Sequence, residues 1–346
     1  MALRLKKINE MTTLMNAICK LPEGGVALCQ VPKPEKAQPG HLLIKMKYSA
    51  VGHGDKAFLN RPLPPGSVES MYGIYGASGV GEVIETGENV SEQYLGKNVT
   101  IYRSLHNSNT LIGCWSEYAH IHWLDCVIIP DDAKPEEYSG TLANLVTPYA
   151  FRMESLREGH AGIISTAGTS TTGIMMLGIA LTLKFPLISI VRNKKGKQLL
   201  KSLGATHVVV QEDPNFDTEL KDMAMQLNTT AVYDALGGAT LNRIIDLLPN
   251  RSTIYSYGFL GDDVPLTVFM RQILFKGLTI KSFGNINTQT VRDPKQLTDA
   301  LKVISTAIGM PHFKTNIGQK FRLQDIEQAI AYQPQGTDKA VLVIGE

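Results

Sequence analysis

The residues best suited to chemistry form a turn of small and hydroxyl side chains at 167–173. The turn follows an apolar run at 162–166 and precedes a helical pattern at 172–184. Small residues there let the backbone approach a pyrophosphate, and a helix N-terminus offers free N–H groups and a positive dipole end. A serine replaces the middle glycine of Gly-x-Gly-x-x-Gly, so an ordinary packing turn is the alternative. Because the turn joins a strand to a helix, we interpret it as a dinucleotide site contacted by Gly168, Ser170, Thr171, Thr172 and Gly173.

The next residues of interest would select the cofactor. About 20 residues after such a turn, an acid binds the ribose of NAD, whereas a cation accommodates the 2′-phosphate of NADP. The strand pattern at 187–191 ends in Arg192-Asn193-Lys194-Lys195, which has cations and no acid. A guanidinium can hold a phosphate with two N–H groups. We therefore predict NADP(H) as cofactor, held by Arg192 and Lys194, with at least one lysine merely solvated.

A sheet is needed to position these residues. The alternation of apolar strands and helical stretches in residues 135–283 predicts one. Apolar strands are expected at 162–166, 187–191, 207–210, 231–235, 253–257 and 278–283, with helices at 172–184, 194–203, 217–227 and 239–248. Strands that are apolar throughout and alternate with helices form parallel sheets covered on both faces. The sequence thus predicts an α/β fold with a doubly wound parallel sheet. Gly204 stands where a left-handed helix cap is expected.

The first third of the chain has a mostly β pattern. Residues 41–51 alternate apolar and polar positions, and further strands are expected at 81–86, 97–102 and 115–129, separated by turn residues. This spacing favours a barrel or a distorted sheet. A helix at 294–308, a short helix at 324–331 and a strand at 340–344 follow the alternating region, and we expect them to return to the first domain. One predicted domain comprises residues 1–130 together with 285–346. The other comprises residues 131–284.

Composition excludes several classes of protein. The 346 residues are 43% hydrophobic, which suits about two folded domains rather than a disordered chain. A net charge of +2 without a run of one sign argues against a nucleic-acid partner. Four cysteines with no C-x-x-C pair argue against a zinc finger or a disulfide framework. Residues 173–183 are too short to span a membrane, which takes about 20 apolar residues. Residues 1–11 lack the apolar stretch of a secretory signal, so we expect a cytoplasmic protein with no membrane partner.

With these features placed, residues 42–343 resemble the medium-chain dehydrogenase/reductase superfamily, on its zinc-free quinone reductase and enoyl reductase side. The motifs that carry the resemblance are, in order, Gly76-x-x-Gly79-x-Gly81-Glu82-Val83, Gly113-x-Trp115-x-Glu117-Tyr118, Thr147-x-Tyr149, Leu203-Gly204-Ala205, Asp234-Ala235-Leu236-Gly237-Gly238 and Tyr257-Gly258. The resemblance implies a GroES-like catalytic domain, a Rossmann domain, and a homodimer through an edge strand within 265–283. It also implies that the cofactor is contacted by Thr147, Gly237, Tyr257, Gly258 and Phe283.

The resemblance makes it possible to ask whether this chain has the ligands of a catalytic zinc ion. Zinc alcohol dehydrogenases carry a Cys-His pair before an Asp, where this chain has Gly52-His53-Gly54-Asp55. Their Gly-His-Glu corresponds to Gly76-Ala77-Ser78, and their four-cysteine loop is absent. A catalytic zinc needs about three protein ligands. We therefore expect no metal.

The substrate side departs from the enoyl-thioester reductases that the cofactor half resembles. Their tyrosine eight residues after the Asp is Leu63 here, their Phe-Trp pair is Phe283-Gly284, and an asparagine of many zinc-free members is Gly52. An enolate product needs a proton from an X–H group or from solvent. The candidate catalytic residues are Asp55, Tyr72 and Tyr75. Tyr48 ends a predicted strand that is expected to approach the same cleft. Each tyrosine could instead only pack, and Asp55 could only hold its loop.

These observations predict a zinc-independent, NADPH-dependent oxidoreductase. Its hydride would pass to a quinone or to a C=C bond conjugated to a carbonyl, both small-molecule substrates. One alternative is a 2-enoyl thioester reductase. The alternative of another class is an NADPH-binding protein without turnover.

Overall fold

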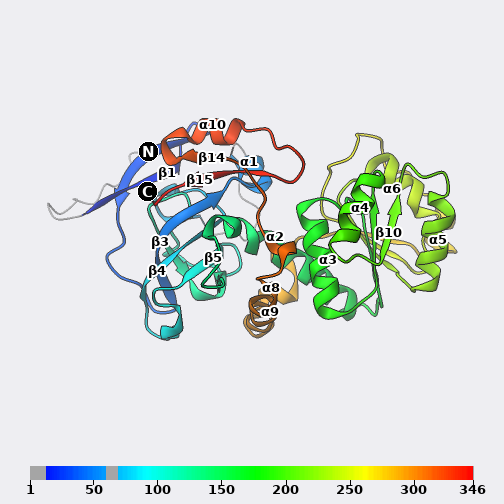
Figure 1. The fold of residues 1–346 in the computed structure, drawn as a ribbon, viewed down its shortest axis with the longest axis horizontal. Coiled ribbons are helices and arrows are strands. Elements are labelled where there is room, and N and C mark those ends of the chain that lie inside the picture. The colour runs from blue at the N-terminus through cyan, green and yellow to red at the C-terminus, as the bar shows by residue number, and fades with distance from the viewer. Residues whose placement is uncertain (1–12, 60–68, 346) are drawn as a thin grey trace. The chain divides into compact units, whose positions relative to one another are not determined.

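The chain forms two compact units. A computed structural model describes residues 13–59 and 69–345. One unit ends at Ala143 and resumes at Lys314, and the other comprises Asn144–Phe313. The chain therefore enters and leaves the second unit once, as the colours of Figure 1 show.

The second unit is built on a six-stranded parallel sheet. Its order is β10-β9-β8-β11-β12-β13, the doubly wound order in which the direction of winding reverses between β8 and β11. The strands are β8 Ile163–Ser165, β9 Leu187–Val191, β10 His207–Val210, β11 Ala231–Asp234, β12 Thr253–Ser256 and β13 Thr279–Ser282. The predicted parallel sheet and its strands are confirmed.

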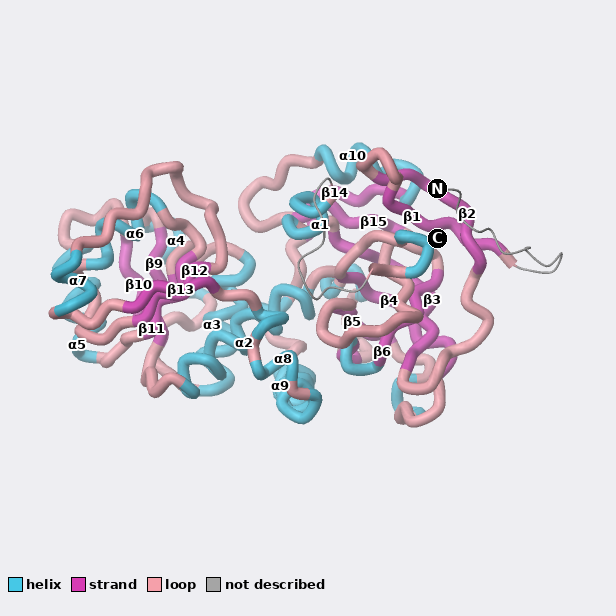
Figure 2. The backbone as a smooth tube through the Cα atoms, turned by 180° about the vertical axis from the view of Figure 1, so that it is seen from behind, coloured by secondary structure: helices cyan, strands magenta, loops and turns pink. Residues whose placement is uncertain are grey.

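Helices lie on either side of this sheet (Figure 2). The helices of this part of the chain are α2 Thr141–Arg157, α3 Thr171–Leu183, α4 Lys194–Ser202, α5 Phe216–Gln226, α6 Gly238–Ile245, α7 Met270–Leu274, α8 Gln289–Arg292 and α9 Pro294–Ala307. Ile164, Ile188 and Val232 of the strands pack with Phe216 and Leu241 of the helices in one buried cluster. Gly204 follows α4 with φ of 92°, the expected left-handed cap.

The first unit is mostly β. A seven-stranded sheet has the order β14-β15-β3-β4-β5-β7, with β6 also paired to β3, and β1 and β2 form a separate pair. The strands are β1 Leu14–Lys20, β2 Val26–Pro32, β3 His41–Ala50, β4 Ser78–Thr86, β5 Asn98–Tyr102, β6 Tyr118–His122, β7 Cys126–Ile128, β14 Ile317–Arg322 and β15 Lys339–Val343. Two short helices, α1 His53–Phe58 and α10 Ile326–Ala331, complete it.

Several elements differ from the prediction. The strand expected at 115–129 is divided into β6 and β7 by a 3₁₀ turn, Trp123–Asp125, where the Asp125 carboxylate is buried. Helix α2 was not predicted because it contains Pro148, which disfavours a helix interior. Strand β14 was not predicted because its side chains are mostly exposed and polar.

Both domain boundaries also differ from those we predicted. Residues 285–313 belong to the second unit, because the end of this segment packs on α3 and on the residue after α4. Phe313 lies against Gly178, Thr182 Oγ1 donates to Met310 Sδ over 3.5 Å, and His312 Nε2 is 2.8 Å from the Leu203 carbonyl. Residues 131–143 belong to the first unit.

Among the described residues, no helix has both the length and the apolar character needed to cross a membrane. Residues 1–11 and Leu63, which entered the sequence predictions, lie outside the described part of the chain.

The packing of α3 on residues 311–313 predicts the effect of adding one methyl group. In Gly178→Ala, the new Cβ would lie 2.5 Å from Phe313 Cε1 and 2.8 Å from His312 Cβ, and the Phe313 ring is fully buried. Overpacking costs about 1–3 kcal/mol, which exceeds the gain of about 1 kcal/mol in helix propensity. Urea unfolding followed by circular dichroism should show a net loss of stability. The control Gly54→Ala meets nothing within 4 Å and should not destabilise the chain; equal effects would contradict the packing argument.

Candidate functional site

The predicted glycine turn leads from β8 into α3 with its backbone closely packed. A Cβ on Gly173 would lie 2.5 Å from the Gly168 carbonyl oxygen, so only glycine fits there. Ser170 caps the helix, its Oγ accepting the Gly173 N–H at 3.1 Å. The N–H groups of Thr171 and Thr172 at the first helical turn cannot bond within the helix. These free donors and the close backbone fit an anionic diphosphate.

Arg192 and Lys194 follow the neighbouring strand β9. The Asn193 side chain caps α4 by accepting the Gly196 N–H at 3.1 Å. A Cβ on Gly196 would lie 3.1 Å from Thr169 Cγ2, so the start of α4 lies against the glycine turn. The Arg192 and Lys194 side chains are exposed, and neither has an ion pair within the described residues. Two free cations therefore stand beside the turn.

A buried carboxylate fixes the third loop of the site. Asp234 Oδ1 accepts the Thr166 hydroxyl at 2.8 Å, and Asp234 Oδ2 accepts the Gly237 N–H at 2.8 Å. Thr166 Oγ1 in turn accepts the Ala235 N–H at 2.9 Å. Gly237 has φ of 67°, a conformation that favours glycine. The loop after β11 is thus tied to the residue that precedes the glycine turn.

Tyr257, Gly258 and Phe283 follow the next two strands. The Tyr257 N–H donates to the Asp234 carbonyl, and a Cβ on Gly258 would lie 3.1 Å from the Ala235 carbonyl oxygen. The Tyr257 hydroxyl is buried without a partner among the described residues, and burial raises the Tyr257 pKa. The five loops after β8, β9, β11, β12 and β13 therefore lie at the carboxyl edge of the parallel sheet, where doubly wound folds bind ligands.

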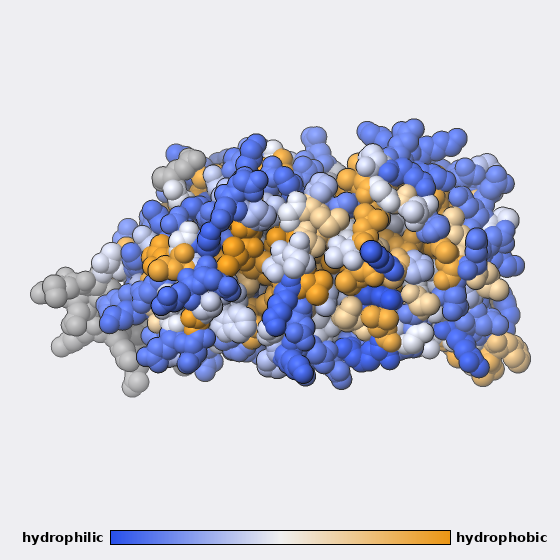
Figure 3. All heavy atoms as spheres, turned by 60° about the horizontal axis from the view of Figure 1, so that its bottom comes forward, coloured by the Kyte–Doolittle hydropathy of each residue, from blue (hydrophilic) through white to orange (hydrophobic). Residues whose placement is uncertain are grey.

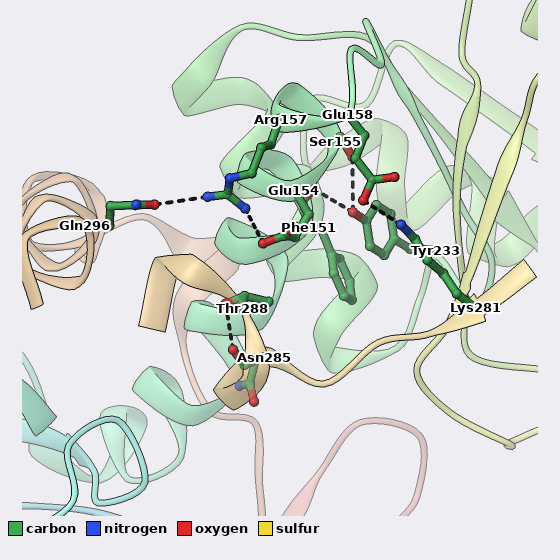
Figure 4. A network of polar contacts seen from close by, with 10 residues as sticks. All are labelled: Phe151, Glu154, Ser155, Arg157, Glu158, Tyr233, Lys281, Asn285, Thr288 and Gln296. Atoms are coloured by element: carbon green, nitrogen blue, oxygen red, sulfur yellow. Dashed lines mark hydrogen bonds and ion pairs between the residues drawn. The ribbon is translucent and has the colours of Figure 1, made fainter. Parts of the chain in front are cut away.

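An aromatic and polar network supports these residues from α2. The Phe151 ring lies 4.8 Å from both the Tyr257 and Phe283 rings and stacks on Tyr233 at 3.9 Å. The Tyr233 hydroxyl donates to the Phe151 carbonyl at 2.7 Å and lies 3.1 Å from Ser155 Oγ (Figure 4). This packing sets the position of Phe283.

Thr147, also on α2, is held by a residue that follows Phe283. The Asn285 Nδ2 group donates to Thr147 Oγ1 at 3.0 Å. The Asn285 carbonyl accepts the Thr288 hydroxyl (Figure 4). The structure therefore brings every predicted cofactor residue into the second unit. Thr147 and Phe283 belong to one connected network there.

The predicted catalytic residues all lie in the first unit. Asp55 is buried, and each of its oxygens accepts one backbone N–H: Gly52 at 2.8 Å and Ala77 at 3.0 Å. Burial raises the Asp55 pKa, while these two hydrogen bonds and Arg103 oppose the rise. Asp55 thus holds the ends of two loops together.

The two tyrosines differ in environment. Tyr72 is 46% exposed and has φ of 58°, and it lines a cavity of about 330 Å³ together with Lys36, Thr110 and His120. Tyr75 is buried against Trp115, and its hydroxyl has no partner among the described residues. Burial raises the Tyr75 pKa to about 12, so its hydroxyl stays protonated near neutral pH. Tyr48 lies beneath Lys320, whose Nζ is 5.5 Å from the ring.

Sequence reasoning missed several residues that hold this site. Asn193, Thr166, Asp234 and Asn285 were not among the predicted site residues. Asn193 had a signal, since asparagine before a helical run is a common cap. Asp234 was noticed only as a motif residue, because its hydrogen bonds join residues 68 positions apart.

Comparison with protein families matches both units. Residues 38–131 match the alcohol dehydrogenase GroES-like domain, and residues 171–305 match the zinc-binding dehydrogenase domain. The human mitochondrial enoyl-[acyl-carrier-protein] reductase is 24% identical over 308 residues, covering 83% of this chain and 79% of the relative. The human synaptic vesicle membrane protein VAT-1 homolog is 25% identical over 65% of this chain and 55% of its own length.

Solved structures share the fold. An enoyl thioester reductase from Candida tropicalis, in a mutant form, has a TM-score of 0.74 at 20% identity, covering 96% of this chain and all of that one. A mycobacterial protein solved with NADPH has a TM-score of 0.67 at 20% identity, covering 95% and 99%. The predicted dehydrogenase/reductase family agrees with the two domain matches. From the two matched domains and the doubly wound and GroES-like units, the chain belongs to the medium-chain dehydrogenase/reductase superfamily of oxidoreductases.

Proposed function

We propose that the chain is a zinc-independent, NADPH-dependent reductase of quinones or of C=C bonds conjugated to a carbonyl. The observation that carries the proposal is the pair of free cations, Arg192 and Lys194, against a glycine turn that only glycine can complete at position 173. The relatives named as enoyl reductases and the mycobacterial neighbour solved with NADPH support it.

Each group of residues then has a role toward the cofactor. Gly168 and Gly173 allow the backbone to approach the diphosphate, while Ser170, Thr171 and Thr172 surround it at the start of α3. Arg192 and Lys194 neutralise the 2′-phosphate. Gly237, Tyr257 and Gly258 form the opposite loops, and Thr147 and Phe283 contact the nicotinamide. The bound cofactor supplies the hydride, and the protein orients it.

Zinc independence rests on the residues at the expected ligand positions. A Cβ on Gly76 would lie 2.3 Å from Trp115 Cδ1, and the Ala77 N–H is bonded to Asp55. Among the described residues, the one group of three potential metal ligands includes neither His53 nor Asp55. These residues support the proposal that the reaction needs no zinc at those positions.

A 2-enoyl thioester is the second candidate substrate. Both the mitochondrial relatives and the Candida tropicalis structure are named for that reaction. The cofactor half of this chain fits either substrate class, so turnover must decide between them. Binding of NADPH without turnover is the remaining outcome.

A homodimer through the segment before β13 and a cytoplasmic location complete the proposal. Strand β13 ends the sheet order, and the preceding segment exposes large apolar side chains at Phe259, Leu260, Val264, Leu266, Phe269, Met270, Ile273, Leu274 and Phe275. Apolar side chains also reach the surface elsewhere among polar ones (Figure 3). Monomers rarely expose large contiguous apolar patches, and light scattering measures whether this chain dimerises.

Replacing the guanidinium tests the cofactor. Arg192→Ala should weaken NADPH binding by about tenfold or more, because a charge-assisted bond contributes about 1.5–3 kcal/mol, and should leave NADH binding nearly unchanged. Fluorescence titration with each nucleotide measures both. Lys195→Ala, an exposed cation of the same turn of α4, is the matched control. Equal losses for the two nucleotides in Arg192→Ala would refute the phosphate contact.

The substrate class is tested by NADPH oxidation with quinones, enones and crotonyl thioesters. Turnover with quinones or enones supports the proposal, and turnover restricted to thioesters supports the second candidate. Tight NADPH binding with no oxidation by any of them would show a binding protein instead.

We further propose Tyr75 as the proton donor to the enolate. Its hydroxyl is protonated and has no hydrogen-bond partner in the described part of the chain, while both oxygens of Asp55 accept a hydrogen bond. Tyr75→Phe should lower kcat by about 10²-fold or more without changing the NADPH affinity. The donor form exists below the Tyr75 pKa of about 12, so this group should cause no fall in kcat between pH 6 and 10. Tyr72→Phe, at an exposed tyrosine, is the control. Unchanged kcat in both variants would mean that solvent supplies the proton.

A further inference from the structure

Four of the eight histidines gather beside β6 in the first unit. The His41 ring stacks on His120 with centroids 4.6 Å apart, and the His106 ring stacks on His122 at 3.6 Å. His41 also meets His122 edge-on at 5.2 Å. His122 pairs with His41 in the β3–β6 register, so the sheet itself sets this arrangement.

Two of these rings are fully hydrogen-bonded. His41 Nδ1 is 2.9 Å from the Pro39 carbonyl and its Nε2 is 2.7 Å from Ser108 Oγ. His120 Nδ1 is 2.8 Å from the Thr110 carbonyl, and its Nε2 accepts the Gln38 N–H at 3.0 Å. Both nitrogens of each ring have a partner, which explains these two histidines as parts of the fold.

The other two rings are not satisfied in this way. His106 Nδ1 is buried without a hydrogen-bond partner among the described residues. The His122 ring receives one long hydrogen bond, from the Leu124 N–H to Nδ1 at 3.3 Å. Burial and neighbouring imidazoles lower the pKa of both rings, that of His122 to about 4.

A buried carboxylate completes the group. Asp125 is fully buried, and its Oδ1 accepts the N–H groups of Leu105 and His106, each at 2.8 Å. Asp125 Oδ2 is buried and has no partner among the described residues. The buried Asp55 and Asp234, by contrast, use both oxygens. An acceptor left bare in the interior calls for a further partner, such as a water molecule, a proton or a bound cation.

We propose that His106, His122 and Asp125 bind one divalent transition-metal ion of the zinc class. One ligand atom from each of the three lies within 4.8 Å of the other two. Two imidazoles and a carboxylate are ligands that zinc accepts, with water in a fourth position. The site contains neither His53 nor residues 76–78, and so it differs from the positions on which the expectation of no metal was based.

The ion would connect two segments that the backbone does not join directly. His106 lies in the loop after β5, whereas His122 ends β6 and Asp125 closes the 3₁₀ turn. The metal would therefore fix this loop on the sheet and have a structural role, because no predicted cofactor residue lies in the first unit. Its binding is independent of the proposed reductase function.

Zinc titration of the full chain tests the site. The purified protein is stripped with a chelator and titrated with Zn²⁺ against a chromophoric chelator, and metal content is measured after dialysis. We expect one zinc per chain. His106→Gln and His122→Gln should each weaken binding by more than about 100-fold, since loss of a partner outside the ligand shell alone costs about 10–100-fold.

The variants are chosen so that the fold is retained. The His106 ring makes no hydrogen bond through Nδ1, so its replacement breaks none there, and circular dichroism together with NADPH titration checks the fold of each variant. His53→Gln is the matched control and should bind zinc like the natural chain.

Three results would overturn the proposal. One is a chain that retains no zinc, as expected if His106 and Asp125 instead form a direct hydrogen bond. Another is unchanged affinity in folded His106→Gln and His122→Gln. The third is loss of zinc in His53→Gln, which would place the metal at the family's catalytic position.

Discussion

The hydrogen bond between Thr166 and Asp234 lies at the centre of the second unit. It joins β8 and β11, the two strands between which the winding of the sheet reverses. Both side chains are fully buried, and a buried carboxyl group is tolerated only when hydroxyl and N–H donors satisfy its oxygens, as they do here. The glycine turn follows Thr166, the loop with Gly237 follows Asp234, and Tyr257 donates to the Asp234 carbonyl. Asp234 therefore aligns three of the five loops at the carboxyl edge, two through its carboxylate and one through its backbone carbonyl.

In the first unit, buried carboxylates hold loops in place at two further positions. Asp55 joins the loop before α1 to the loop before β4, and Asp125 holds the loop after β5. In each case the carboxylate accepts a backbone N–H from a segment 19 to 22 positions away in the sequence. A carboxylate suits this role because it accepts several hydrogen bonds, and bonds to a charged acceptor are the stronger ones.

The sequence patterns predicted those features of the fold and of the site that depend on residues close together in the chain. Strands such as Leu187–Val191 are apolar throughout, and the glycine turn and Arg192 follow strands at a fixed spacing. Contacts between distant residues were not predictable in this way. His106 was no candidate because its stacking on His122 follows from the path of the loop after β5. The boundary at Phe313 was missed because a helical pattern at 294–307 does not reveal which unit receives it, and that depends on the space left open by Gly178.

The position of β15 has a consequence for the order in which the chain folds during synthesis. Strand β15 lies between β14 and β3, so the sheet of the first unit pairs Tyr48, Ser49 and Ala50 with residues 341–343. Its buried cluster likewise combines Ile18 and Trp115 with Phe321 and Leu342. A ribosome completes Asn144–Phe313 before β14 and β15 exist, and domains generally fold as units. The sheet of β8–β13 can therefore form while the first unit still has the edge of β3 uncovered, and the last strand to emerge closes the unit that began to emerge first.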